Sequence, residues 1–126
     1  MGAETIWSII SNYKFNENDT IIIQSNTKNA WLRKTVTEQG FAITDERFLM
    51  ERQIPVFIMV LKISKKKIHA LTQEDVLIGP VLKQNITGEY LDYLTNRANH
   101  LYSIKSHNID LETEYNTIRN ILEKEC

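Results

Sequence analysis

The sequence has few cysteines, glycines and prolines. Its 126 residues contain one cysteine, four glycines and two prolines. A single thiol, Cys126 at the last position, leaves no internal disulfide and no thiolate metal site, and four scattered glycines leave no glycine-rich phosphate loop. No apolar run approaches the ~20 residues of a membrane-spanning helix, and the first residues lack the basic and apolar regions of a signal peptide. We therefore expect a cytoplasmic protein with no membrane partner.

Histidine is also scarce, and its positions do not indicate a metal. The three histidines, His69, His100 and His107, do not have the spacing of zinc ligands. We interpret them as surface or packing residues and expect no metal site. The sequence also lacks a Ser/His/Asp pattern and a Walker loop.

The charge is nearly balanced in total but not along the chain. The chain is 42% hydrophobic and 25% charged with a formal net charge of -1, which is typical of a single folded domain. The span from Arg52 to Gln73 has no acidic residue, whereas the tail from Asp110 onward is acidic. The basic side chains of that span are Arg52, Lys62, Lys65, Lys66 and Lys67. A neutral total can hide a basic patch, and such a patch binds phosphate backbones. The alternative is a solvated loop.

One strand, residues 20–26, organises the first part of the chain. Three isoleucines in a row indicate a strand covered on both faces, as in a parallel sheet flanked by helices. The strand ends at Gln24, Ser25 and Asn26, and chemistry in such sheets collects at the carboxyl ends of the strands. The amides of Gln24 and Asn26 can donate to and accept from a nucleobase edge. Alternatively, these residues only turn the chain and cap the next helix.

Hydrophobic spacing predicts the elements around this strand. Residues 3–13 are predicted as a helix whose apolar face holds Ile6, Ile9, Ile10 and Tyr13. A second helix over residues 27–39 is predicted to be capped by the Thr27 hydroxyl and closed by Gly40 in a left-handed conformation. A strand over 41–52 is interrupted by four polar residues, 44–47, which predict a bulge or an edge position. It should then turn at 53–55 into a central, antiparallel strand over 56–63.

The remaining residues are predicted to be mainly helical. A lysine-rich loop over 64–70 precedes a short helix with a capping box at Thr72, which Gly79-Pro80 ends. From Thr87 onward, apolar residues spaced 3-4-3-4 predict two antiparallel helices with a coiled-coil seam, the second capped by Asp110. The fold class is therefore α/β with an antiparallel hairpin, followed by an α-helical coiled-coil hairpin. We expect the boundary after residue 70, with residues 71–126 forming the helical region.

Several short segments, spread over nearly the whole chain, carry a resemblance to one family. They are Met1 to Ile6, Ile21 to Asn26, Leu32 to Lys34, Glu38 to Ile43, Leu71 to Leu82, and Tyr90-Leu91. In order and spacing they are similar to segments of the bacterial tRNA N1-methyladenosine methyltransferases, which act on the adenine at tRNA position 22. The Ile78-Gly79-Pro80 part is the most specific. Two mild departures are Ser25, where that family has proline, and Ala3, where it has glycine.

The resemblance implies a class I, Rossmann-like methyltransferase that uses S-adenosyl-L-methionine to methylate N1 of adenine in tRNA. It implies that the loop Met1, Gly2 and Ala3 borders the cofactor and that Gln24 and Asn26 hold the adenine. Contacts to tRNA are expected from Lys62, Lys65, Lys66, Lys67, Arg97 and Lys105.

The resemblance covers only the C-terminal half of that family's fold. The cofactor loop and the acidic ribose-binding residue belong to the other half, so residues 1–70 are expected to form a partial Rossmann-like domain, and the chain is expected to be inactive alone. Strand 20–26 would pair with strand 56–63 on one side and expose its other edge. We expect that edge to bind an N-terminal methyltransferase half or a second copy. The alternative is a non-catalytic RNA-binding or coiled-coil interaction module.

Overall fold

The computed structural model describes residues 2–64 and 70–125. The chain divides into two compact units, Met1–Asn85 and Ile86–Cys126. This division lies later than the predicted boundary after residue 70. The reason is that helix α3 (Gln73–Ile78) packs against α2 (Asn29–Glu38), and the short 3-10 helix η1 (Leu82–Gln84) packs against a strand of the sheet. None of the described helices is long and apolar enough to cross a membrane.

The first unit is built on three antiparallel strands. They are β1 (Ile21–Ser25), β2 (Phe41–Glu51) and β3 (Ile54–Ile63), in the order β1-β3-β2. The apolar strand β3 is central and pairs with both neighbours, as predicted. The register of β2 against β3 shifts between Ile43 and Asp45, which confirms the predicted bulge.

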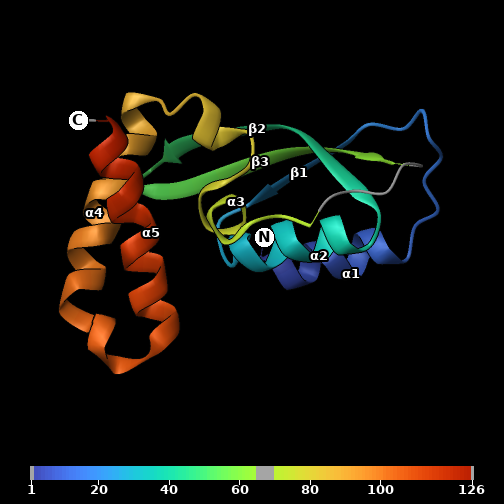
Figure 1. The fold of residues 1–126 in the computed structure, drawn as a ribbon. Helices are drawn as coiled ribbons and strands as arrows, with labels where there is room; N and C mark the ends of the chain where they lie inside the picture. The colour runs from blue at the N-terminus through green and yellow to red at the C-terminus, as the bar shows by residue number, and fades with distance from the viewer. Residues whose placement is uncertain (1, 65–69, 126) are drawn as a thin grey trace. The chain divides into compact units, whose positions relative to one another are not determined.

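The prediction that β1 is covered on both faces is wrong for the described residues. Its burial alternates: Ile21, Ile23 and Ser25 are buried, whereas Gln24 is exposed and Ile22 is 69% exposed. The helices α1 (Ala3–Ser11) and α2 both lie on one face of the sheet (Figure 1). The opposite face of β1 therefore carries an apolar side chain that no described element covers.

The core of the first unit lies between this sheet and its two helices. It is formed by Ala3, Ile6, Ile10, Ile21, Ile23, Leu32, Val36, Phe41, Met59 and Leu61. The helix α1 is confirmed but ends at Ser11, so Tyr13, which is 65% exposed, lies beyond it. Ile9 is 58% exposed because a helix packed on a single sheet face buries a stripe about 100° wide, and Ile9 lies at its margin.

The predicted ends of α2 and α3 agree with the structure except at Thr27. Gly40 follows α2 with a φ of +96°, and Thr72 and Asp75 form the capping box of α3. The capping role of Thr27 is wrong, because the N-cap residue of α2 is Lys28, with φ 51° and no side-chain cap. The Thr27 backbone N–H instead lies 3.4 Å from the Ser25 hydroxyl, which forms a local turn.

The second unit is a pair of antiparallel helices. Helix α4 (Gly88–Ile104) begins at a Thr87 cap, and the 3-10 helix η2 (Lys105–His107) leads into α5 (Ile109–Glu125). The predicted cap Asp110 is wrong, since the Asn108 side-chain oxygen accepts from the Leu111 N–H at 2.9 Å. Most of the predicted seam is buried, and the buried residues of the two helices are Tyr90, Leu94, Ala98, Leu101, Ile118, Ile121 and Leu122.

The turn between β2 and β3 lies one residue earlier than predicted. Its central residues are Arg52 and Gln53, with φ 51° and 67°. Positive φ at both positions is the pattern of a type I′ hairpin turn, which favours Asn-Gly. A residue with a side chain pays about 1–2 kcal/mol in this region of backbone space. The turn is therefore set by the pairing of the strands and not by its own residues.

Replacing Gln53 by glycine should stabilise the first unit. We expect Gln53→Gly to raise the free energy of unfolding by up to about 1 kcal/mol, because glycine adopts positive φ without a steric cost. Urea denaturation measures the change. Gln39→Gly is the matched control, since Gln39 has φ -94° and glycine there should destabilise. Equal effects of the two variants would contradict a strained turn.

Candidate functional site

The start of α1 and the loop after β1 lie side by side. A Cβ built on Gly2 would lie 3.4 Å from the Thr27 side-chain oxygen. The Lys28 ammonium, on the loop, forms an ion pair with the Glu4 carboxylate of α1. The structure thus brings Gly2 and Ala3 next to the strand end that holds Gln24 and Asn26, while Met1 lies outside the described residues. The Lys28–Glu4 pair was not found from the sequence, because the residues are 24 positions apart.

The three polar residues at the end of β1 have different roles. Ser25 is 1% exposed, and its hydroxyl donates to the Thr27 carbonyl at 2.9 Å. Gln24 and Asn26 are exposed, and neither amide has a hydrogen-bond partner among the described residues. The turn-forming alternative therefore applies to Ser25, and the two amides are left accessible to a ligand.

One further polar atom at this end of α2 was missed by the sequence reasoning. The side-chain oxygen of Asn29, the first residue of α2, is buried and has no hydrogen-bond partner in the part of the chain that the structure describes. A buried polar oxygen without a hydrogen-bond partner lowers the stability of the fold, and such atoms are rare in folded proteins. Asn29 follows the left-handed Lys28 directly, and no sequence pattern marks it.

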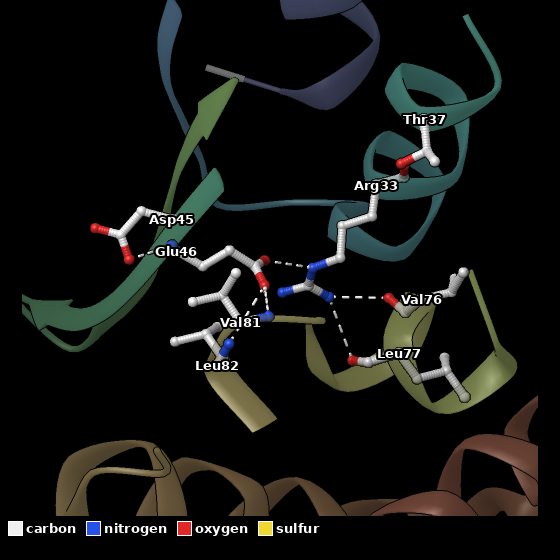
Figure 2. Close-up of polar contacts among 8 residues, drawn as sticks. All are labelled: Arg33, Thr37, Asp45, Glu46, Val76, Leu77, Val81 and Leu82. Atoms are coloured by element: carbon white, nitrogen blue, oxygen red, sulfur yellow. Dashed lines mark hydrogen bonds and ion pairs between the residues drawn. The ribbon is translucent and has the colours of Figure 1, made fainter. Parts of the chain in front are cut away.

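A buried ion pair lies beneath the segment that follows α3 (Figure 2). Arg33 of α2 and Glu46 of β2 are each 1% exposed, and Arg33 Nε donates to Glu46 Oε2 at 2.8 Å. Arg33 Nη1 donates to the carbonyl oxygens of Val76 at 2.9 Å and Leu77 at 3.4 Å (Figure 2). These carbonyls belong to the last turn of α3, where helix carbonyls lack partners within the helix. The arginine therefore ties α3 to α2.

The other carboxylate oxygen of Glu46 binds the start of η1. Glu46 Oε1 accepts from the backbone N–H groups of Val81 at 2.9 Å and Leu82 at 3.4 Å (Figure 2). Gly79 has φ +115°, and a Cβ built on it would lie 2.7 Å from Glu46 Oε1. The chain therefore needs glycine at this position both for its backbone conformation and for the approach of Glu46. This explains physically why Ile78-Gly79-Pro80 stands out in the sequence.

A second charged pair, between Asp75 of α3 and Lys83 of η1, links these two short helices. Lys83 Nζ lies 2.5 Å from Asp75 Oδ1. Burial pushes the pKa of Asp75 upward, but the hydrogen bonds from Lys83 and Thr72 outweigh it and the pKa lies below its ordinary value. The hydrogen bond to Asp75 raises the pKa of Lys83. Both groups therefore stay charged near neutral pH.

The predicted tRNA contacts that the structure describes belong to both units, Lys62 to the first and Arg97 and Lys105 to the second. Lys62 is exposed on β3, and Lys65, Lys66 and Lys67 lie outside the described residues. In the second unit, Arg97 donates two hydrogen bonds to the Glu114 carboxylate, at 2.8 and 3.0 Å. These hydrogen bonds raise the pKa of Arg97.

Lys105, the other predicted contact of the second unit, lies over two tyrosine rings. Arg97 and Lys105 thus already have partners within the protein. Among residues 2–64 and 70–125, no group of three or more His, Cys, Asp or Glu side chains is placed to hold a metal ion.

Comparison with protein families gives a match over nearly the whole chain. The model of TrmK, described as tRNA (adenine(22)-N(1))-methyltransferase, matches residues 1–125. No curated protein matches the chain.

Solved structures share the fold of this chain. A Streptococcus pneumoniae protein in complex with S-adenosyl-L-methionine is 24% identical, with a TM-score of 0.84 over 97% of this chain and 56% of that chain. A Streptococcus agalactiae protein of the NADB-Rossmann superfamily is 26% identical, with a TM-score of 0.81 over the same shares. M. capricolum TrmK in complex with S-adenosyl-homocysteine is 24% identical, with a TM-score of 0.77, again over 97% and 56%. The chain thus spans about 56% of the length of these structures.

Removing one member of the buried pair should destabilise the first unit strongly. We expect Arg33→Met to lower the free energy of unfolding by about 3–5 kcal/mol, because the Glu46 charge is left buried without its partner. The double variant Arg33→Met/Glu46→Leu should recover only part of the lost stability, because two carbonyls of α3 and two N–H groups at the start of η1 then lose their partners. Urea denaturation measures each change.

The matched control for the Arg33→Met variant is Arg47→Met. Arg47 is 74% exposed and lies 3.4 Å from Asp45, so its removal should change stability by less than about 1 kcal/mol. A similar loss for Arg33→Met and Arg47→Met would show that the buried pair does not hold α3 and η1.

Proposed function

The chain belongs to the family of tRNA (adenine(22)-N(1))-methyltransferases, and from this membership we propose that it takes part in transferring a methyl group from S-adenosyl-L-methionine to N1 of adenine in tRNA. In this proposal, residues 1–70 are part of a Rossmann-like methyltransferase domain. Residues 71–126 form the helical region, of which α3 and η1 pack within the first unit and the two long helices act as a coiled-coil hairpin. The enzyme acts in the cytoplasm.

The family match over residues 1–125 is the observation that carries this proposal. The likeness to solved structures supports the α/β fold of the first unit and its relation to the Rossmann superfamily. Because the chain spans about 56% of the length of those structures, the activity is proposed for the whole protein.

The proposed reaction depends mainly on how the adenine is oriented toward the methyl group. N1 of neutral adenine carries a lone pair, so it attacks the methyl carbon without a strong base. The N1–C bond forms as the S–C bond breaks, and S-adenosyl-homocysteine leaves. The positive charge passes to the adenine, which then loses a proton to solvent. Placing the flipped adenine in line with the methyl group lowers the barrier, and we assign this positioning to Gln24 and Asn26.

The cofactor contacts of this chain are limited. A glycine-rich turn between a strand and a helix is the usual cradle of such cofactors, and the glycines of the described residues do not form one: they lie at 2, 40, 79 and 88. We propose that Met1, Gly2 and Ala3 only border the cofactor, and that its main contacts come from other residues of the whole protein.

Two measurements separate this proposal from its alternatives. The direct test incubates the whole protein with S-adenosyl-L-methionine and unmodified tRNA and maps N1-methyladenine by reverse-transcription stops. Calorimetry of the whole protein with S-adenosyl-L-methionine alone then tests cofactor binding. Cofactor binding would exclude a binding-only module. Salt-dependent tRNA binding without cofactor binding would favour the non-catalytic RNA-binding module, and neither activity would leave only a coiled-coil interaction protein.

Charge reversal tests the proposed tRNA contacts. We expect Lys62→Glu to weaken tRNA binding and to reduce the slope of log K against log salt by about one, because one phosphate contact is lost. Lys65→Glu/Lys66→Glu/Lys67→Glu should reduce the slope further. Lys14→Glu, at an exposed residue after α1, is the matched control for net charge. Equal slopes for all variants would contradict phosphate contacts at these lysines. Arg97 and Lys105 remain proposed contacts, although both have partners within the chain.

The free edge of β1 is the proposed binding site for an N-terminal methyltransferase half or a second copy. In the described residues, β1 pairs with β3 on one side only, and Ile22 is 69% exposed. An open apolar edge favours association. Light scattering should show a mass that rises with concentration, and Ile22→Lys should lower it, unlike Ile9→Lys at an exposed position of α1. A stable monomer at high concentration would exclude the second copy as partner, and co-purification then tests the N-terminal half.

A further inference from the structure

Two tyrosines and a lysine form a compact cluster where α4 runs into η2. The rings of Tyr102 and Tyr115 lie 5.9 Å apart, centroid to centroid, with their planes tilted by 49°. The Lys105 ammonium lies 5.5 Å from the centroid of the Tyr102 ring and 5.2 Å from that of Tyr115. Both distances are within the range of cation–π attraction. We call Tyr102, Lys105 and Tyr115 the tyrosine–lysine cluster.

The cluster is only partly explained by packing of the helix pair. Tyr115 and Lys105 are half-buried, but Tyr102 is 67% exposed. Leu101, directly before it, is fully buried and fills the seam. Tyr102 is therefore not needed to close the core, yet its ring is held in place by contacts with Tyr115 and Lys105. The result is a large, fixed aromatic surface that faces solvent.

From this cluster we infer that the helix pair binds an unpaired nucleobase of RNA, which stacks on the exposed ring of Tyr102. The inference rests on the proposed function, which makes tRNA the partner. Proteins that bind single-stranded nucleic acids stack bases on aromatic side chains next to cations. Such a site accepts any base, because every base has a π-face. The ordered neighbours reduce the conformational entropy that the ring loses on binding.

The charges around the cluster decide which part of the RNA it binds. Lys105 and His107 are close in the chain to Asp110 and Glu112, which are exposed in the first turn of α5. The two carboxylates outnumber the one lysine, so this surface offers little attraction to a phosphate backbone. The contact made by Tyr102 is therefore to a base. Lys105, which remains a proposed contact to tRNA, also holds the ring.

The test compares tRNA binding by full-length variants. Tyr102→Ala should raise the Kd for unmodified tRNA by roughly 5- to 150-fold, the range that base stacking gives on alanine substitution. Tyr102→Phe should retain binding. The loss should be the same at low and high salt, unlike the loss in Lys62→Glu, because stacking releases no counterions. Tyr13→Ala is the matched control, because Tyr13 is 65% exposed in the first unit.

Each outcome decides the inference. Equal affinities for Tyr102→Ala, Tyr13→Ala and the wild type would overturn the stacking site and leave the proposed function intact. A wild type that does not bind tRNA would overturn the proposed function and the stacking site together. If Tyr102→Ala unfolds, Tyr102→Leu keeps apolar volume without a π-face. Binding by Tyr102→Leu equal to that of Tyr102→Phe would show a packing role only and would also overturn the inference.

Discussion

The first unit depends on one buried interaction, the ion pair between Arg33 and Glu46. Both side chains are almost fully buried, and together they serve carbonyls of α3 and N–H groups at the start of η1. Burying two charges is costly unless their remaining hydrogen-bonding sites are also satisfied. Here most of them are satisfied by backbone groups that would otherwise lack partners, although Arg33 Nη2 has none in the described residues. The cost of desolvating the two charges is thus offset by their hydrogen bonds to backbone groups at the ends of α3 and η1, which would otherwise lack partners.

This arrangement accounts for how a short, irregular segment holds a defined conformation. Helix α3 is six residues long and has too few turns to be stable alone. Its capping box, its salt bridge to Lys83 and the Arg33 hydrogen bonds replace the stability that length would give. Glu46 also explains Gly79, because no side chain fits between its carboxylate and the turn. The segment with the most specific sequence resemblance is therefore also the one most tightly constrained by the fold.

Much of the fold could be predicted from patterns that act locally. The central strand β3, the bulge in β2, the Gly40 helix end and the Thr72 capping box follow from spacing and from the preferences of single residues. The missed features depend either on a choice between neighbouring residues or on partners far apart in the chain, such as Lys28 and Glu4. Lys28 takes the N-cap position of α2 because Ser25 already forms a turn with Thr27, and the β2–β3 turn uses Arg52 and Gln53 because strand register places them there. For the site, the residue types were visible, but their exposure and their neighbours were not.

The sequence by itself determined the element order, the family and the residue types at the end of β1. Tertiary structure decided which side chains remain accessible. Gln24 is exposed and Ser25 is buried, because successive residues of a strand point to opposite faces and only one face is covered by helices. Asn26 lies just after the strand and is exposed. Likewise, Arg97 and Lys105 look alike as cations in the sequence, but Glu114 and the two tyrosine rings engage them differently. Local preference sets a helix or strand, whereas burial and partner choice come from segments far apart in the chain.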